Sequence, residues 1–223
     1  MTGPVKSENL NNEAKEAKAA IERGENIHDA VRNIMLAALQ KGRFDSVETK
    51  RVVRSVIQGA TLGLGNAGDK SQQALRETLA GIDDALAKLA EASKLAIEEA
   101  AGRLHDYRKH DLERAFNDMR TLEGMFLDSI KEVADQSVGE AKKILQDLLR
   151  HARDSGTTAG DTAKSAIAAL EKKFGRTLRE VAAAGADIAL STGSNLAEAA
   201  SGFLAGIAEA LDTRAKNMRN ARK

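Results

Sequence analysis

The sequence predicts an all-α fold built from long amphipathic helices. Pro4 is the only proline among 223 residues, and the alternation of β-branched and aromatic residues that is typical of strands is absent. Apolar residues also recur every eleven positions through most of the chain. That spacing is about 3.67 residues per turn, so the apolar side stays on one face of a nearly straight helix. We expect an antiparallel hairpin or bundle of such helices, preceded by short N-terminal helices.

The kinds of apolar residue predict thin helices that approach one another closely. Apolar residues make up 42% of the chain, which suffices for a substantial core, but there is no Trp, one Tyr and five Phe. A deep aromatic pocket is therefore not expected. The absence of Cys excludes disulfides and thiolate metal sites.

The net charge argues against nucleic acid as a partner, and the opening residues predict the location. The net charge of +1 comes from 34 basic and 33 acidic side chains spread along the chain, so no large field collects nucleic acid. The opening residues 1–9 have neither the apolar core of a signal peptide nor a transmembrane segment. We expect a cytoplasmic protein that binds no specific nucleic acid.

Residues 1–68 are expected to form short helices followed by a Gly-rich linker. Gly24-Glu-Asn26 separates a helix over about residues 7–23 from a second helix that ends at Lys41-Gly42. Asp45-Ser-Val-Glu48 has the form of a capping box and opens a third helix. The glycines that are expected to end this third helix are Gly59, Gly63, Gly65 and Gly68.

Residues 69–155 are expected to form a long amphipathic helix, opened by the capping pattern Asp69-Lys-Ser-Gln72. Two places could interrupt it: a polar block near 102–111 and a second capping-box pattern, Ser137-Val-Gly-Glu140. Either could be a kink, a loop or no break at all. The apolar register on this segment begins Leu75, Thr78, Ile82; Leu86, Leu89, Ser93; and continues through Met119, Leu122, Phe126; Ile130, Val133, Ser137.

Residues 156–223 are expected to form a second long amphipathic helix. It follows the Gly/Thr-rich break Gly156-Thr-Thr-Ala-Gly160, with Asp161 as its expected N-cap. Its end is basic, and cations suit a helix C-terminus, so we read that end as solvated. The basic residues there are Arg214, Lys216, Arg219, Arg222 and Lys223.

The residue patterns that could carry chemistry are weak. His105 and His110 lie five apart, about 140° around a helix, whereas paired metal ligands favour separations of three or four. The glycines of residues 63–68 resemble a phosphate loop but follow a helix and lack Gly-Lys-Ser/Thr. No His with an orienting carboxylate can be placed beside the Ser and Thr residues of 155–165. We therefore expect no enzyme activity, no metal and no cofactor.

The stretch from Val181 to Leu211 carries few charged residues. Its only charges are Asp187, Glu198 and Glu209, which leaves a wide smooth face opposite them. Three carboxylates disfavour insertion into a membrane, so packing against a partner helix is expected. The side chains expected to form that contact, between copies in a homo-oligomer, are Phe203, Leu204, Ile207 and Leu211.

Several segments together resemble an uncharacterised all-helical family of proteobacterial proteins whose function is unassigned. They include AIERGENIHDAVRNIMLAALQKGRFD, VVRSVIQGATLGLG, DLLRHARDSGTTAG and SGFLAGIAEALD. The resemblance spans nearly the whole chain and implies a bacterial cytosolic protein, with no catalytic or binding residues to carry over. More loosely, the eleven-residue repeat and the Ala richness are similar to phasins and exchangeable apolipoproteins.

Two functions remain open from the sequence. In the leading hypothesis the chain is a non-enzymatic structural or interaction protein whose apolar stripes pack within the chain and between copies. In the alternative, the stripes open to coat a lipid or polymer surface. Both need the same stripe, so the sequence does not decide between them.

Overall fold

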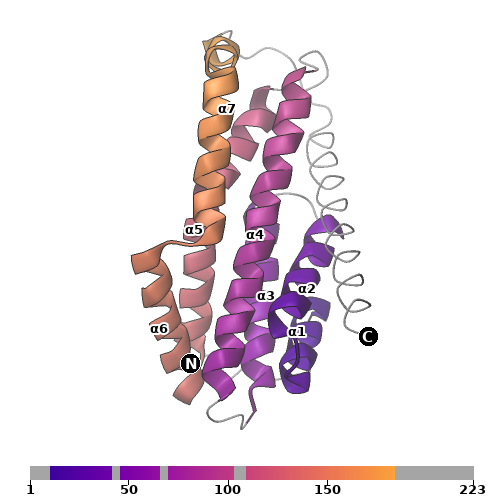
Figure 1. Cartoon of the computed structure of the whole chain (residues 1–223), viewed down its shortest axis with the longest axis vertical. Helices are drawn as coiled ribbons and strands as arrows, with labels where there is room; N and C mark the ends of the chain where they lie inside the picture. Colours follow the sequence, from indigo (N-terminus) through magenta and orange to yellow (C-terminus); the bar gives the residue numbers. More distant parts are fainter. Residues whose placement is uncertain (1–10, 42–45, 66–69, 103–108, 184–223) are drawn as a thin grey trace, which may run out of the picture.

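The computed structural model describes residues 11–41, 46–65, 70–102 and 109–183, and within these ranges every regular element is an α-helix. The prediction of an all-α fold is confirmed. Figure 1 shows the helices packed side by side along the long axis of the molecule. They are α1 (Asn12–Arg23), α2 (Ile27–Lys41), α3 (Ser46–Gly63), α4 (Lys70–Gly102), α5 (Lys109–Gln136), α6 (Gly139–Ser155) and α7 (Thr158–Ala183).

The first helix begins and ends where its local sequence provides caps. The side chain of Asn11 accepts a hydrogen bond from the backbone N–H of Ala14, and its own Nδ2 donates to Ser55 Oγ of α3 at 2.7 Å. At the other end Gly24 takes a left-handed conformation, with φ of 69°, and its N–H donates to the carbonyl of Ala20. The predicted break at Gly24-Glu-Asn26 therefore ends α1, and residues 7–10 of the predicted helix lie outside the described residues.

Two glycines inside α3 let α1 approach it closely, which corrects the prediction that Gly59 ends this helix. A Cβ on Gly59 would overlap the backbone of Ala14, and one on Gly63 would overlap the backbone of Lys18. The pairing of 14 with 59 and of 18 with 63 shows that the two helices run parallel. Glycine in a helix interior is destabilising, but here it permits backbone contact. The helix ends at Gly63, and Gly65 follows with φ of 48°.

A third glycine, Gly81, plays the same part between α2 and α4. A Cβ at this position would stand 2.5 Å from the carbonyl oxygen of His28 and close to the backbone of Arg32. Beside this contact Arg32 Nη1 lies 3.1 Å from Asp29 and 3.4 Å from Asp84 of α4. Gly81 and the ion pair between Arg32 and Asp84 therefore determine where α2 crosses α4.

The long helices α4, α5 and α7 form the body of the bundle (Figure 1). Asp83 of α4 contacts Thr158 of α7, and Glu98 further along α4 contacts Lys173 further along α7. The separation in sequence is 75 residues in both pairs, so the two helices run parallel. Arg120 of α5 pairs with Glu171, whereas the later Glu123 pairs with Lys164, so α5 runs antiparallel to α7. Residues 70–183 thus build a bundle of shorter helices, and α4, with 33 residues, is only about 50 Å long.

Both places where the sequence suggested an interruption lie between two helices of the structure. α4 ends at Gly102 and α5 begins at Lys109, while α5 ends at Gln136 and α6 begins at Gly139 and turns back along α5 (Figure 1). The capping box read at 137–140 does not form. The N-cap is Val138, which makes no side-chain capping bond, and Ser137 Oγ instead donates to the carbonyl of Val133. Gly139, with φ of 62°, makes the sharp turn.

One continuous core runs through α1–α7. Large side chains that are fully buried in it include Met35, Ile57, Leu86 and Ile130. These residues of the apolar register on α4 and α5 are buried: Leu75, Thr78, Ile82, Leu86, Leu89, Ser93, Ile97, Met119, Leu122, Phe126, Ile130 and Val133.

Little apolar surface is left over in this part of the chain. Among the described residues the exposed large hydrophobic side chains are Val47, Leu95 and Val138. None of the helices in the described ranges is long and apolar enough to cross a membrane.

Candidate functional site

The residues predicted to form a partner contact are not placed by the structure. Phe203, Leu204, Ile207 and Leu211 lie outside the described residues, as does the basic end of the chain. His105 also lies outside them, and His110 is described only as part of the backbone of α5. Within the side chains that are described, no group of three or more His, Asp or Glu residues is arranged to hold a metal ion.

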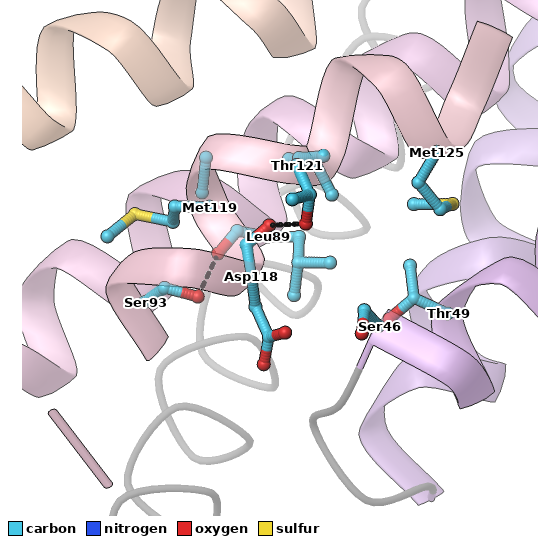
Figure 2. Close-up of a pocket in the computed structure, with 10 residues that line it drawn as sticks. Ser46, Thr49, Leu89, Ser93, Asp118, Met119, Thr121 and Met125 are labelled. Carbon is cyan, nitrogen blue, oxygen red and sulfur yellow. Dashed lines mark hydrogen bonds between the residues drawn. The ribbon is translucent and has the colours of Figure 1, made fainter. Parts of the chain in front are cut away.

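A small cavity opens between the first turn of α3 and the facing parts of α4 and α5 (Figure 2). Its volume is about 30 Å³, which accommodates a water molecule, whereas pockets for organic ligands measure about 300–1,000 Å³. The hydroxyl of Ser93 on its wall donates to the carbonyl of Leu89, and that of Thr121 donates to the carbonyl of Asp118. These hydroxyls are engaged by their own helices, so the cavity is a packing gap.

A denser polar arrangement lies where α7 begins, and we call Asp83, Glu123 and Thr157 the capping clamp. Asp83 projects from α4, and its two carboxylate oxygens accept hydrogen bonds from consecutive backbone N–H groups of α7. The distances are 2.9 Å from Thr158 N to Oδ2 and 2.8 Å from Ala159 N to Oδ1. The first backbone N–H groups of a helix have no partner inside it, and negative charge is favourable there. Another helix therefore supplies part of the cap of α7.

Glu123 of α5 holds the same helix end from a second direction. Its Oε1 accepts from the backbone N–H and from the hydroxyl of Thr157, both at 3.2 Å. Its other oxygen, Oε2, lies 3.0 Å from Nζ of Lys164, two turns into α7. Thr157 is itself the N-cap, because its Oγ1 accepts from the N–H of Gly160 at 3.0 Å. The prediction that Asp161 caps this helix was wrong: Asp161 lies in the first turn.

Two glycines make room for the clamp. Gly156 has φ of 79° and ψ of 179°, a conformation open essentially to glycine alone, and it turns the chain from α6 into α7. At Gly160 a Cβ would overlap the carboxyl group of Glu123. The five residues of Gly156-Thr-Thr-Ala-Gly160 therefore form the turn, provide the N-cap of α7 and leave space for the Glu123 carboxylate.

The surroundings of Glu123 stabilise its charged form. Burial raises the pKa of Glu123, but the hydrogen bond and charge of Lys164 and the two donors of Thr157 outweigh burial, so the pKa lies below its ordinary value. The hydrogen bond to Glu123 in turn raises the pKa of Lys164. Glu123 is therefore charged at neutral pH.

Sequence reasoning found the break at 156–160 but missed the two carboxylates. Thr157, a preferred N-cap residue directly after Gly156 and before the apolar pattern of α7, is the signal that could have placed the N-cap correctly. No local pattern marks Asp83 or Glu123, because they lie in the middle of other helices and act on a helix far away in sequence. Their role appears only when α4, α5 and α7 are packed together.

Because every oxygen of the two clamp carboxylates is engaged by a backbone N–H, a hydroxyl or an ammonium group, the clamp binds the chain to itself. Fold and site together define an all-α helical bundle whose polar cluster fixes one helix on two others. The chain belongs to the family of unknown function DUF6781, which it matches over residues 4–213. No curated protein and no solved structure matches it.

Proposed function

We propose that the chain is a non-enzymatic helical structural or interaction protein that associates with copies of itself. The observation that carries the proposal is a contrast between two parts of the chain. Where side chains are described, the helices bury most of their large apolar side chains against one another. Between Val181 and Leu211, by contrast, the sequence has three charged residues in 31 and needs a partner for its apolar face.

A second copy of the chain is the partner that this stretch fits best. Two copies present the same apolar side chains, so a symmetric contact buries both faces at once. The large residues available are Phe203, Leu204, Ile207 and Leu211. Their spacing of three and four residues places them on one side of a helix.

The assignment as a non-enzymatic protein is supported by how the polar groups are used. The capping clamp directs its carboxylates to backbone N–H groups, to the hydroxyl of Thr157 and to Lys164. Carboxylates used in this way order a helix. They do not form a general acid and base facing an open site.

The proposal is tested by placing charge in the expected contact. In the variant Phe203→Asp/Ile207→Asp, four carboxylates would meet in a dimer, so the solution mass should fall to that of one chain. The matched control is Gln146→Asp/His151→Asp, which adds the same charges at exposed positions of α6 and should leave the mass unchanged. Unfolding of the first variant, seen as lost circular dichroism, would place the contact within one chain instead of between copies.

The alternative is a coat on a lipid or polymer surface, and the same samples distinguish it. Because the register residues of α4 and α5 are buried in the core, a coat that used them would have to open the bundle. Flotation with anionic vesicles or polyester granules should leave the wild-type protein in the unbound fraction. A monomer that floats with either surface, and that loses binding in the double Asp variant, would replace self-association by a coat.

A further inference from the structure

Charged groups contact the helix α7 at several points between its N-cap and Lys173. Asp83 and Glu98 of α4 contact Thr158, Ala159 and Lys173, at distances of 2.8 to 3.5 Å. Glu123 and Arg120 of α5 contact Thr157, Lys164 and Glu171, at 3.0 to 3.2 Å. These contacts are distributed along the helix from its N-cap to Lys173, so charge fixes both its start and its register.

The apolar contribution of α7 is small over the same length. Between residues 158 and 173 the buried apolar side chains are Ala159, Ala163, Ala166 and Leu170. The shorter helix α6 buries three large ones, Ile144, Leu145 and Leu149. Since the free energy of burial scales with apolar area, three alanines and one leucine stabilise docking less than two leucines and an isoleucine. Charge contacts therefore carry a larger share of the docking of α7.

The connection between α6 and α7 allows one helix to move without the other. It consists of Gly156 and Thr157, and Gly156 has a backbone conformation that only glycine adopts readily. α6 is anchored by its own apolar side chains in the core, and α7 begins directly after the turn. Segments with few large buried contacts are those that open locally in folded proteins.

We infer that α7 is a releasable arm: its docking on α4 and α5 opens as a unit about Gly156 when Asp83 and Glu123 lose their charge, while α1–α6 stay folded. The inference is independent of the proposed function, since it holds for one chain or for several. It assigns the capping clamp a control role, because the two carboxylates come from outside α7 and their charge state acts on the whole helix.

The groups that face the clamp fix the direction of the effect. Glu123 faces Lys164 of α7, lies one turn from Arg120 on α5, and shares the helix end with Asp83 of α4. Lys164 and the N-terminal N–H groups of α7 favour the charged carboxylates, and Lys164 also lies 3.9 Å from Asp161. Neutralising the carboxylates removes the favourable contacts and leaves Lys164 with only the more distant Asp161. Release should therefore follow loss of negative charge.

Hydrogen exchange of the full chain at pH 7 tests this, with the double variant Asp83→Asn/Glu123→Gln compared with wild type. Each change keeps the size of the side chain and removes its charge. We expect amides of residues 161–173 to exchange at least about tenfold faster, because hydrogen bonds to charged groups contribute the larger part of such contacts. Amides in α2 and in the buried half of α4 should keep their wild-type rates. The control variant, Glu16→Gln/Asp128→Asn, neutralises two exposed carboxylates elsewhere and should change neither region.

Two results would overturn the inference. Unchanged exchange of residues 161–173 in the double variant would show that the clamp charges do not control docking. Acceleration by the same factor in α2, α4 and α7 would show that the bundle opens only as a whole. If the double variant fails to fold, hydrogen exchange of the wild-type protein in low concentrations of urea provides the test. We then expect the free energy of opening to be lower for amides of α7 than for amides of α4. The same free energy of opening in both helices would reject a releasable arm.

Discussion

The carboxyl group of Glu123 occupies the space where a side chain at residue 160 would begin. A Cβ built on Gly160 lies closer to this carboxyl group than real Cβ contacts ever come. The same carboxylate accepts hydrogen bonds from Thr157, so it cannot move aside without giving up a cap of α7. Because residue 160 is a glycine, Glu123 of α5 can therefore bind the start of α7.

Gly160→Ala should destabilise the protein by about 1–3 kcal/mol, because the methyl group displaces the Glu123 carboxylate from the backbone N–H and the hydroxyl of Thr157. Gly124→Ala is the matched control. Gly124 is exposed in α5 with nothing near its Cβ position, so alanine should stabilise by up to about 1 kcal/mol through helix propensity. Urea unfolding followed by circular dichroism measures both. Equal effects of the two substitutions would contradict the close approach of Glu123 to Gly160.

Gly59→Ala should separate α1 from α3, because its methyl group would overlap the backbone of Ala14, which cannot rotate away as a side chain can. We expect a loss of about 2 kcal/mol or more in the free energy of unfolding. We also expect faster hydrogen exchange in α1 than in α4. A variant as stable as wild type, with α1 still protected, would show that the two helices are not in backbone contact.

Leu145→Ala should cost about 2–5 kcal/mol, since Leu145 is fully buried and is one of three large side chains that anchor α6. Val138→Ala serves as the comparison, because Val138 is 81% exposed and neither valine nor alanine caps a helix, so it should change stability by less than about 0.5 kcal/mol. Thermal or urea unfolding separates the two. If both variants had wild-type stability, α6 would not be docked as described.

Acid should remove part of the stability through Glu132, which links α5 to Lys50 and Arg54 of α3. The hydrogen bond from Lys50 lowers the pKa of Glu132, burial raises it, and the charge of Arg54 lowers it further. A pKa that is lower in the folded than in the unfolded chain stabilises the fold above the ordinary value, near 4.5. This contribution is lost as the pH falls through the folded value.

The variant Glu132→Gln should therefore be less stable than wild type at pH 7, by up to about 1 kcal/mol for a pair this close to the surface. The difference should shrink as the pH falls below the folded pKa, where wild-type Glu132 is itself neutral. Urea unfolding at a series of pH values between 3 and 7 measures the difference. A difference that stayed constant over this range would assign the effect to packing instead of charge.

The sequence predicts the fold class and the break at Gly24, because local residue choices determine both. Gly24 ends α1 through a left-handed conformation. The sequence also marks 102–111 and 137–140 as places where a helix could be interrupted, without deciding between a kink, a loop and no break, and α5 ends at Gln136. In each case the cause lies within a few residues of the break.

Close helix packing and contacts between residues far apart in sequence could not be predicted from local sequence patterns. Gly59 was read as a terminator, yet it lies inside α3 because α1 packs against it. The sequence also predicts that Asp161 is the N-cap of α7. In the structure Thr157 is the N-cap, and Asp83 and Glu123 accept hydrogen bonds from backbone N–H groups that lie 75 and 34 residues away in sequence. A side chain that caps a helix from another helix leaves no spacing signal in the sequence.

The most direct test of self-association is the solution mass of the full-length wild-type chain by sedimentation equilibrium, over a wide range of concentration at pH 7. We expect a mass of two chains or more that declines toward that of one chain on dilution. A mass of one chain at every concentration, with normal helical content, would contradict self-association.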